Sequence, residues 1–194
     1  MRFMGIILAG GKSTRMKCDK ANLSWHGQSL LNRQIEIVSL LVGPENTYVS
    51  GKRELANSIS DIDENLGPLE GLRTVLSSIY SANKYDAAIV LPVDMPLLSV
   101  EQLRKLMILS PECEVTCFAG YQLPAVFCNL QNVIAQLTKL KAQTAVDSRI
   151  KYSFKNLYKQ LIVKTVDTLA TSDFINTNTP EEWQNALSKA NKTR

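Results

Sequence analysis

The chain has 194 residues, with 22 Lys or Arg and 18 Asp or Glu, so its formal net charge is +4. Its composition of 45% hydrophobic and 21% charged residues is typical of a globular protein and excludes a disordered or fibrous chain. The charge is too mild and too dispersed to indicate nucleic-acid binding, but it suits an enzyme whose substrates are phosphorylated anions.

Cysteine spacing, apolar runs and linkers set the remaining limits. The four cysteines have no zinc-knuckle spacing, and reduced thiols in the cytosol are their expected state. No apolar run is long enough to span a membrane, and the chain shows no signal-peptide pattern. Since it also shows no repeat or linker, residues 1–194 are expected to form a single cytoplasmic domain.

The first expected element is a short buried strand that ends at a pair of glycines. Residues 6–9 are apolar, and at Gly10 and Gly11 the backbone can approach a ligand without a Cβ in the way. Ser, Thr, Arg15 and three lysines follow up to Lys20. This pattern is typical of polyphosphate binding, with an ordinary strand and basic turn as the alternative. The spacing does not match a P-loop, which needs a glycine one position after Gly5.

Helices and strands are then expected to alternate. Helices are expected at 30–41, 68–80 and 99–109, a single helical turn at 54–57, and strands at 47–50, 58–60 and 87–91. The unbroken apolar run at 87–91 is typical of a central parallel strand covered on both faces. Alternation at this period predicts a doubly wound α/β sheet, in which ligands bind beyond the carboxyl ends of the strands.

The second half is expected to complete the sheet and add two helices. Strands are expected at 115–118, 125–128 and 161–166, helices at 130–140 and 180–190, and an extended segment at 174–178. Thr179, Pro180 and Glu182 predict the start of the last helix, with Thr as cap and Glu reaching back. The lysine-rich stretch 139–159 has weak periodicity, and a solvated face is favoured over a binding patch because its charges are dispersed.

Asp94 is the candidate metal ligand. It lies three residues beyond Leu91, between Pro92 and Pro96, which stiffen the backbone. Alone, this segment fits a plain turn aspartate. The glycine pair at the same edge of the predicted sheet instead favours a carboxylate that holds Mg²⁺.

Four motifs, in this order along the chain, resemble those of the molybdenum cofactor guanylyltransferases. They are Leu8-Ala9-Gly10-Gly11 with Arg15-Met16 and Asp19-Lys20-Ala21, then Gly67-Pro68-Leu69-Glu70-Gly71, Asp94-Met95-Pro96, and Asn176-Thr177-Asn178-Thr179-Pro180-Glu181-Glu182. A weaker match is Tyr121–Ala125. The resemblance covers nearly the whole chain. It implies a three-layer, Rossmann-like α/β domain with a mostly parallel sheet, of the nucleotide-diphospho-sugar transferase type.

The resemblance also implies roles for individual residues. Arg15, Lys20 and Asp94 are the expected catalytic residues, and Asp94 is the expected Mg²⁺ ligand. Substrate binding is expected at Leu8, Ala9, Gly10, Gly11, Lys20, Ser50, Asp61, Gly67 and Asp94, with Asn176 and Asn178 on the pterin side. Asp61 and Asp63 compete for the nucleotide contact, and the spacing in the family favours Asp61.

Two positions depart from the family pattern. Lys17 stands where the family usually has Gly, which alters the conformations open to the loop. Ser50 falls near a position where some members use Asn to contact the base, so a base contact at Ser50 is in question. The Leu-Ala-Gly-Gly form of the first motif favours GTP over CTP.

The implied reaction transfers GMP from GTP to the terminal phosphate of molybdopterin or molybdenum-molybdopterin and releases diphosphate. The nucleophile, a phosphate monoester, is largely ionised at pH 7, so no protein base is needed and His26 is expected to be a loop residue. Cofactor-insertion proteins and acceptor molybdenum enzymes are the expected partners; nucleic acid and membranes are not. The alternatives are a cytidylyltransferase on the same cofactor, a sugar-phosphate nucleotidyltransferase, and a nucleotide-binding module without turnover.

Overall fold

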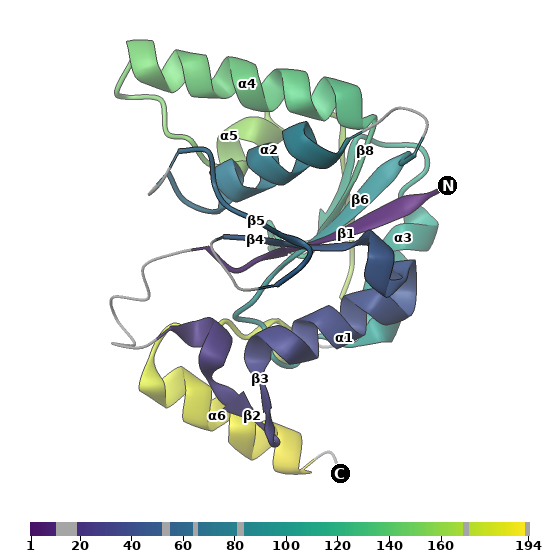
Figure 1. The fold of residues 1–194 in the computed structure, drawn as a ribbon, viewed down its shortest axis with the longest axis vertical. Helices are drawn as coiled ribbons and strands as arrows, with labels where there is room; N and C mark the ends of the chain where they lie inside the picture. The colour runs from purple at the N-terminus through teal and green to yellow at the C-terminus, as the bar shows by residue number, and fades with distance from the viewer. Residues whose placement is uncertain (11–18, 52–54, 64–65, 81–83, 169–170, 193–194) are drawn as a thin grey trace.

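The computed structural model describes residues 1–10, 19–51, 55–63, 66–80, 84–168 and 171–192, and Figure 1 shows the fold. The strands are β1 (Phe3–Leu8), β2 (Ser24–Trp25), β3 (Gln28–Ser29), β4 (Thr47–Ser50), β5 (Ser58–Ile59), β6 (Ala87–Pro92), β7 (Val115–Phe118), β8 (Ala125–Cys128) and β9 (Val163–Val166). The helices are α1 (Leu30–Val42), α2 (Pro68–Ile79), α3 (Val100–Leu109), α4 (Leu130–Val146), α5 (Phe154–Tyr158) and α6 (Pro180–Lys192). Short 3-10 turns are η1 (Lys20–Asn22), η2 (Pro44–Asn46) and η3 (Thr171–Phe174).

A seven-stranded sheet in the order β5-β4-β1-β6-β8-β7-β9 forms the middle layer. β1 pairs in parallel with both β4 and β6, and β8 runs antiparallel between β6 and β7. The register opposes Leu8 to Ser50 on one side and to Pro92 on the other, so three strands end at the same level. The predicted mostly parallel sheet is therefore confirmed, and the segments after Leu8 and Leu91 do share its carboxyl edge.

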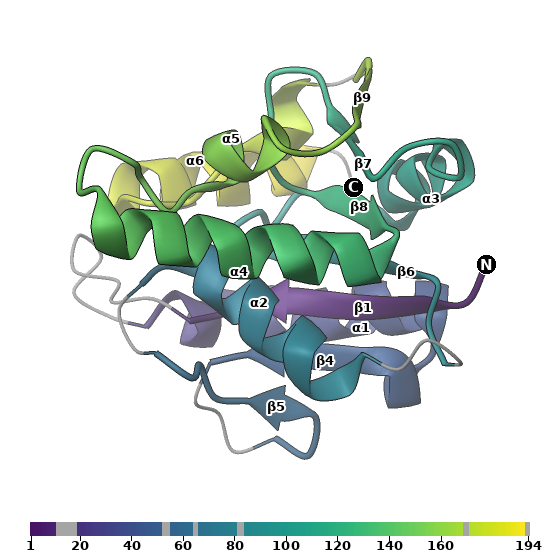
Figure 2. The ribbon, with the colours of Figure 1, turned by 90° about the horizontal axis from the view of Figure 1, so that it is seen from above.

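Helices cover both faces of the sheet, as the two views in Figures 1 and 2 show. Alternate side chains of the central strands enter two separate cores because successive residues of a strand point to opposite faces. Ile7, Ile89 and Leu91 belong to the core under α1 and α3, whereas Ile6 and Val90 belong to the core under α2, α4 and α5. The predicted three-layer arrangement is confirmed.

Local sequence signals explain most element boundaries. Ser99 and Gln102 form the predicted capping box of α3, and His26 and Gly27, both with positive φ, turn the chain between β2 and β3. The helical turn predicted at 54–57 is wrong over residues 55–57, which form a plain turn into β5; residue 54 lies outside the described residues.

Three boundaries in the second half differ from the predictions. α4 continues to Val146, and α5 is an additional helix that the weak periodicity of the lysine-rich stretch did not indicate. Ser153 caps α5, and Phe154 and Leu157 are its buried residues, too few to produce a clear helical pattern. The predicted extended segment at 174–178 begins inside η3, and β9 begins only at Val163. In the described part of the chain, no helix combines the length and apolar composition needed to cross a membrane.

Gly5 provides a test of how closely α1 packs on β1. A Cβ at Gly5 would overlap Val38 Cγ1 and lie 3.2 Å from Val42 Cγ2. Gly5→Ala is therefore expected to destabilise the protein by about 2 kcal/mol, measured by urea unfolding, because a packed interior resists added volume. Adding Val38→Ala removes the overlapping methyl, so the double variant should be more stable than the sum of the two single effects predicts. Additive effects would contradict this packing.

Candidate functional site

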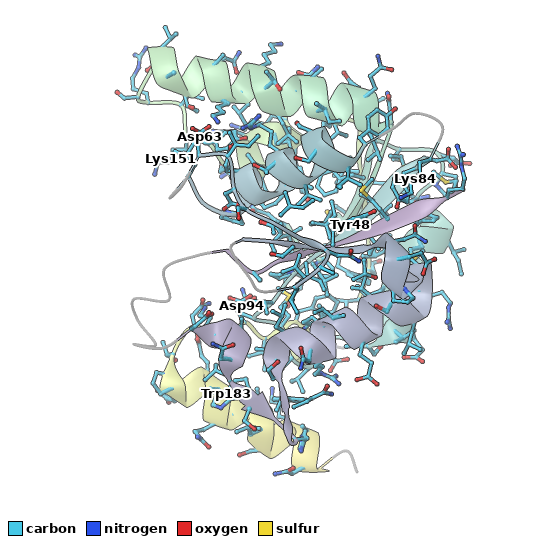
Figure 3. All side chains as sticks on the ribbon, viewed as in Figure 1. Tyr48, Asp63, Lys84, Asp94, Lys151 and Trp183 are labelled. Atoms are coloured by element: carbon cyan, nitrogen blue, oxygen red, sulfur yellow. The ribbon has the colours of Figure 1, made fainter. Side chains whose placement is uncertain are left out.

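A cleft of about 520 Å³ opens at the carboxyl edge of β1 and β6. On one face of the sheet, the cleft is bounded by the starts of α2 and α5. On the other face, it is bounded by η1 and the segment before α6. Figure 3 shows Asp94 on the α6 side and Asp63 on the α2 side. The predicted site residues in its lining are Leu8, Ala9, Gly10, Lys20, Asp94 and Asn176. Residues that are distant in the sequence therefore meet where the sequence analysis expected a ligand.

Lys20 joins three segments of the chain inside the cleft. Its Nζ donates to Asp94 Oδ2 at 3.0 Å and to Asn178 Oδ1 at 2.5 Å. The side chains of Lys20 and Asp94 are only 14% and 20% exposed, so this ion pair is largely shielded from water. The structure thus brings together two of the three predicted catalytic residues and one predicted pterin-side residue.

The backbone that carries Asp94 is held from both sides. The carbonyl of Asp94 accepts two hydrogen bonds from Thr177, one from its amide (2.9 Å) and one from its hydroxyl (3.1 Å). Gln34 in α1, which is 0% exposed, donates Nε2–H to the carbonyl of Met95 at 2.8 Å. Sequence reasoning missed Thr177 and Gln34 as supports. The signal at Gln34 was an amide within the apolar stripe of a helix, where a buried polar side chain needs a partner.

The start of α6 orders the predicted asparagine segment. Glu182 Oε2 accepts from the amides of Asn178 (2.7 Å) and Thr179 (2.9 Å), and Thr179 Oγ1 accepts from the amide of Glu182. This confirms the predicted helix start. The side chain of Asn178 thereby reaches Lys20, while Asn176 lines the same cleft.

Asp61 and Ser50 lie beside the first glycine of the loop. Ser50 Oγ donates to Asp61 Oδ1 at 3.0 Å, and a Cβ at Gly10 would lie 3.1 Å from Asp61 Oδ2. A Cβ at Gly71 would overlap Ser50 Oγ, so only glycine permits this approach. Ser50 is 1% exposed and supports Asp61 from behind, and its own nucleotide contact stays a prediction.

Asp63 has different surroundings from those of Asp61. Its carboxylate pairs with Lys141 and lies 3.7 Å from Arg73 Nη2. The hydrogen bond from Lys141 is the main cause that lowers the pKa of Asp63 below its ordinary value. Of the two competing aspartates, Asp61 is therefore the one beside the Gly10 backbone, and which of them contacts the nucleotide stays a prediction.

Gly67 directly precedes α2 and has a φ of 84°, a left-handed value that glycine adopts without strain. Pro68, the first residue of the helix, lines the cleft. The predicted helix start is confirmed, with Pro68 at the first helical position, where a missing N–H costs no hydrogen bond. The substrate contact predicted for Gly67 stays a prediction.

The remaining wall of the cleft consists of Gly120, Tyr121, Gln122, Leu123 and Phe154. The weaker match at Tyr121–Ala125 indicated most of it, but Phe154 was missed because α5 was not expected. The Tyr121 ring lies 4.6 Å from that of Phe174, so the wall includes an ordered aromatic pair. Gly11, Arg15 and Lys17 lie outside the described residues, so the roles of Gly11 and Arg15, and the effect of Lys17 on the loop, stay predictions.

The carboxylates of the cleft limit which metal it suits. Among the described residues there is no group of three or more His, Cys, Asp or Glu side chains that could hold a metal ion. Asp94 and Asp19 line the cleft, and Asp19 Oδ1 accepts from the amide of Ala21, which caps η1. A site with so few carboxylates fits Mg²⁺, which keeps waters and takes phosphate oxygens from its substrate, better than a metal that needs a full protein cage.

Comparisons with known proteins agree with this fold. The family model of the MobA-like NTP transferase domain matches residues 5–156. A molybdenum cofactor guanylyltransferase of Xanthomonas euvesicatoria is 37% identical over 185 residues, which cover 94% of this chain and 93% of the relative.

Two solved structures have the same fold. Molybdopterin-guanine dinucleotide biosynthesis protein A from Archaeoglobus fulgidus superposes with a TM-score of 0.75 at 19% identity, covering 97% of this chain and 99% of the other. The 4-diphosphocytidyl-2C-methyl-D-erythritol synthase from Anaerococcus prevotii gives a TM-score of 0.74 at 13% identity, covering 97% and 96%. These matches confirm the predicted nucleotide-diphospho-sugar transferase type of fold.

Proposed function

The chain belongs to the MobA-like NTP transferase family, and on that premise we propose that it transfers GMP from GTP to the terminal phosphate of molybdopterin or molybdenum-molybdopterin. The 37% identity to a guanylyltransferase over nearly the whole chain supports GTP as donor. The structural observation that carries the proposal is the junction of Lys20, Asp94 and Asn178 in one cleft beside the Gly10 backbone.

The chemistry is a displacement at the α-phosphorus of GTP. An oxygen of the terminal phosphate of molybdopterin forms a bond to this phosphorus, the bond to the bridging oxygen breaks, and diphosphate leaves. Because the attacking phosphate is already ionised at neutral pH, no residue of the chain has to remove a proton. The task of the protein is to bring two polyanions together and hold them in line.

The charged and polar groups of the cleft suit that task. The ammonium of Lys20 would bind phosphate oxygens, and the Gly10 backbone would let the triphosphate approach β1 closely. Asp61 is the proposed nucleotide contact at the ends of β1 and β4, while Asn176 and Asn178 are the proposed contacts to the pterin substrate. For Arg15 and Gly11 the proposal rests on the sequence motif alone.

Asp94 is the proposed ligand of Mg²⁺. The ion would lower the repulsion between the phosphates and the attacking group. Asp94 lines the cleft and its side chain is only 20% exposed, which supports this role, because a partly shielded carboxylate attracts a cation more strongly than an exposed one. Magnesium that enters with the nucleotide requires no larger protein cage.

The same premise bears on partners and on the alternatives. We propose that the product passes to cofactor-insertion proteins and acceptor molybdenum enzymes, in the cytoplasm. A cytidylyl or sugar-phosphate transferase is not favoured, since a relative that is 37% identical over nearly the whole chain is a guanylyltransferase. A module without turnover would not need Lys20 and Asp94 together in the cleft.

Nucleotide-dependent stabilisation is the first test. GTP with Mg²⁺, at about 100 times its Kd, is expected to raise Tm by roughly 5–10 °C, because a ligand that binds only the folded state stabilises it. CTP and ATP should give a smaller rise at the same concentration. Diphosphate release should then require GTP, Mg²⁺ and molybdopterin together. Equal diphosphate release with CTP would contradict GTP as the donor. Binding of GTP without diphosphate release would favour the nucleotide-binding module without turnover.

A further inference from the structure

Glu70 is a fully buried carboxylate in the first turn of α2, and the proposed chemistry does not use it. Arg73 donates to both of its oxygens, from Nε at 2.9 Å and from Nη2 at 2.5 Å. Lys141 of α4 donates to Oε1 at 3.1 Å, and the Tyr152 hydroxyl donates to Oε2 at 3.4 Å. Two cations and a hydroxyl therefore satisfy a charge that would otherwise be costly to bury.

These bonds join parts of the chain that line the cleft. Glu70 lies two residues after Pro68, and Tyr152 lies two residues before Phe154, and both Pro68 and Phe154 are in the cleft lining. Lys141 also pairs with Asp63, in the loop that carries Asp61. Figure 3, in the view of Figure 1, shows Asp63 near one end of α2 and α4. We call Glu70, Arg73, Lys141 and Tyr152 the Glu70 network.

A buried ion pair is not the least costly way to join two helices. Apolar side chains of similar size often stabilise a fold as well or better, since they carry no desolvation cost. Hydrogen bonds to a carboxylate, in contrast, fix direction and distance. The Glu70 network lies at the cleft end of α2. It therefore fixes Pro68 and Phe154 relative to the opposite wall, which contains Lys20 and Asn176.

The strand order indicates which substrate meets this wall. Asp94 follows β6, and the proposed nucleotide contacts Gly10 and Asp61 lie on the β1–β4 side of it. Leu123 and Phe154 line the cleft with the β7–β8 segment, on the other side of β6, whereas Pro68 starts α2, which packs on β1 and β4. With GTP on the first side, the acceptor lies on the second.

We propose that Glu70 is a positioning residue for the acceptor: through its bond to Tyr152 it fixes Phe154 relative to the start of α2, at the spacing that the phosphorylated pterin requires. The inference rests on the proposed function for the identity of the acceptor. The positioning itself is a property of the fold and can be measured without turnover.

Glu70 is ionised and Tyr152 is neutral in the network at neutral pH. Burial raises the pKa of Glu70, but the hydrogen bonds from Arg73 and Lys141 outweigh burial and hold that pKa below its ordinary value. Burial, with the charge of Glu70 second, raises the pKa of Tyr152, so its hydroxyl keeps its proton. Asp63, the other acid that faces this cluster, has a lowered pKa as well.

The contribution of Glu70 to stability is therefore complete above the ordinary carboxyl pKa of about 4.3 and is lost as the pH falls through the lower folded value. The difference in stability between the parent and Glu70→Gln should be constant near neutral pH and should narrow only in that acidic range.

Glu70→Gln tests the positioning, because it keeps the shape and removes the charge. The KM for molybdopterin is expected to rise about tenfold with kcat close to the parent value, while the Kd for GTP stays within about twofold. Tyr152→Phe, a milder change that removes one hydrogen bond, should shift the same KM in the same direction by less. Equal KM values in the parent and both variants would overturn the proposal, whatever happens to Tm.

Glu114→Gln is the matched control. Glu114 also joins α4 to its neighbours through Asn132 and the amide of Ile162, but at the other end of α4, outside the cleft lining. This variant is expected to lower Tm without changing the KM for molybdopterin. A KM shift as large as that of Glu70→Gln would show that loss of stability alone explains the effect.

Hydrogen exchange separates this inference from the proposed function. If the parent protein transfers no GMP, the proposed function fails, yet the positioning is still measurable. Glu70→Gln should then speed amide exchange about tenfold in residues 66–72 and 150–156, and Glu114→Gln should not. Unchanged exchange in both segments would overturn the positioning role even in an active enzyme.

Discussion

Asp94→Asn is expected to lower kcat for GMP transfer by about 10³-fold, measured as diphosphate release at saturating GTP and molybdopterin. The substitution keeps the size of the side chain and the backbone bonds from Thr177 to the Asp94 carbonyl, so it removes only the negative charge. Without that charge, the proposed Mg²⁺ would lose its carboxylate ligand. The negative charge that builds up on the reacting phosphates would then be stabilised less. GTP binding in the absence of Mg²⁺ should change little, because Lys20 remains in the cleft.

Asp86→Asn is the control on the same strand. Asp86 directly precedes β6, whereas Asp94 follows it, so the two carboxylates lie at opposite ends of one element. Hydrogen bonds from Arg2 lower the pKa of Asp86 to about 2, so the control also removes an ionised, paired carboxylate. Parent-like activity is expected. If Asp94→Asn transfers GMP at the parent rate, Asp94 is not the metal ligand.

Lys20→Met is expected to lower kcat/KM by about 10²-fold, because one cation that orients the phosphates is lost. Met retains most of the length and the apolar stem, so the comparison isolates the ammonium. The same variant should bind Mn²⁺, used as a probe for Mg²⁺, more tightly in the absence of nucleotide. The reason is that Nζ, 3.0 Å from Asp94 Oδ2, repels a second cation at that carboxylate.

These opposite changes in activity and in metal affinity are what distinguish Lys20 from a residue that only stabilises the fold. Lys105→Met serves as control, since Lys105 lies outside the cleft lining, is half-buried and donates to the Asp167 carbonyl. It should change neither property. A Lys20→Met protein with lower activity and unchanged Mn²⁺ affinity would contradict competition at Asp94.

The sequence predicted those elements whose signals are local. β4, β7 and β8 begin and end at the predicted residues because each is a short β-branched or apolar run between turn residues. The caps at Ser99 and Thr179 were readable because both partners of each capping box lie within one turn. α5 has no such local signal. Because this helix was not predicted, Phe154 was missed as a residue of the cleft.

What the sequence could not reveal depends on contacts across the fold. Glu70 occupied the variable position of a matched motif, and only the packing of α4 and Tyr152 around α2 makes it a buried acid. Likewise, no local pattern indicated that Ser50 would hold Asp61, or that Gln34 would support the backbone after Asp94. Sequence reasoning therefore identified residues that can touch substrate more readily than those that support them.

The reversed strand β8 has an evolutionary consequence. Because β8 runs against β6, its amino end faces the cleft, and the 119–124 connection from β7 reaches the side of the cleft proposed for the acceptor as a hairpin loop. Such a loop tolerates insertions and deletions without disturbing the parallel ladder of β1, β4 and β6. Descendants of this fold can therefore acquire new acceptors by changing one hairpin while they inherit the donor half unchanged.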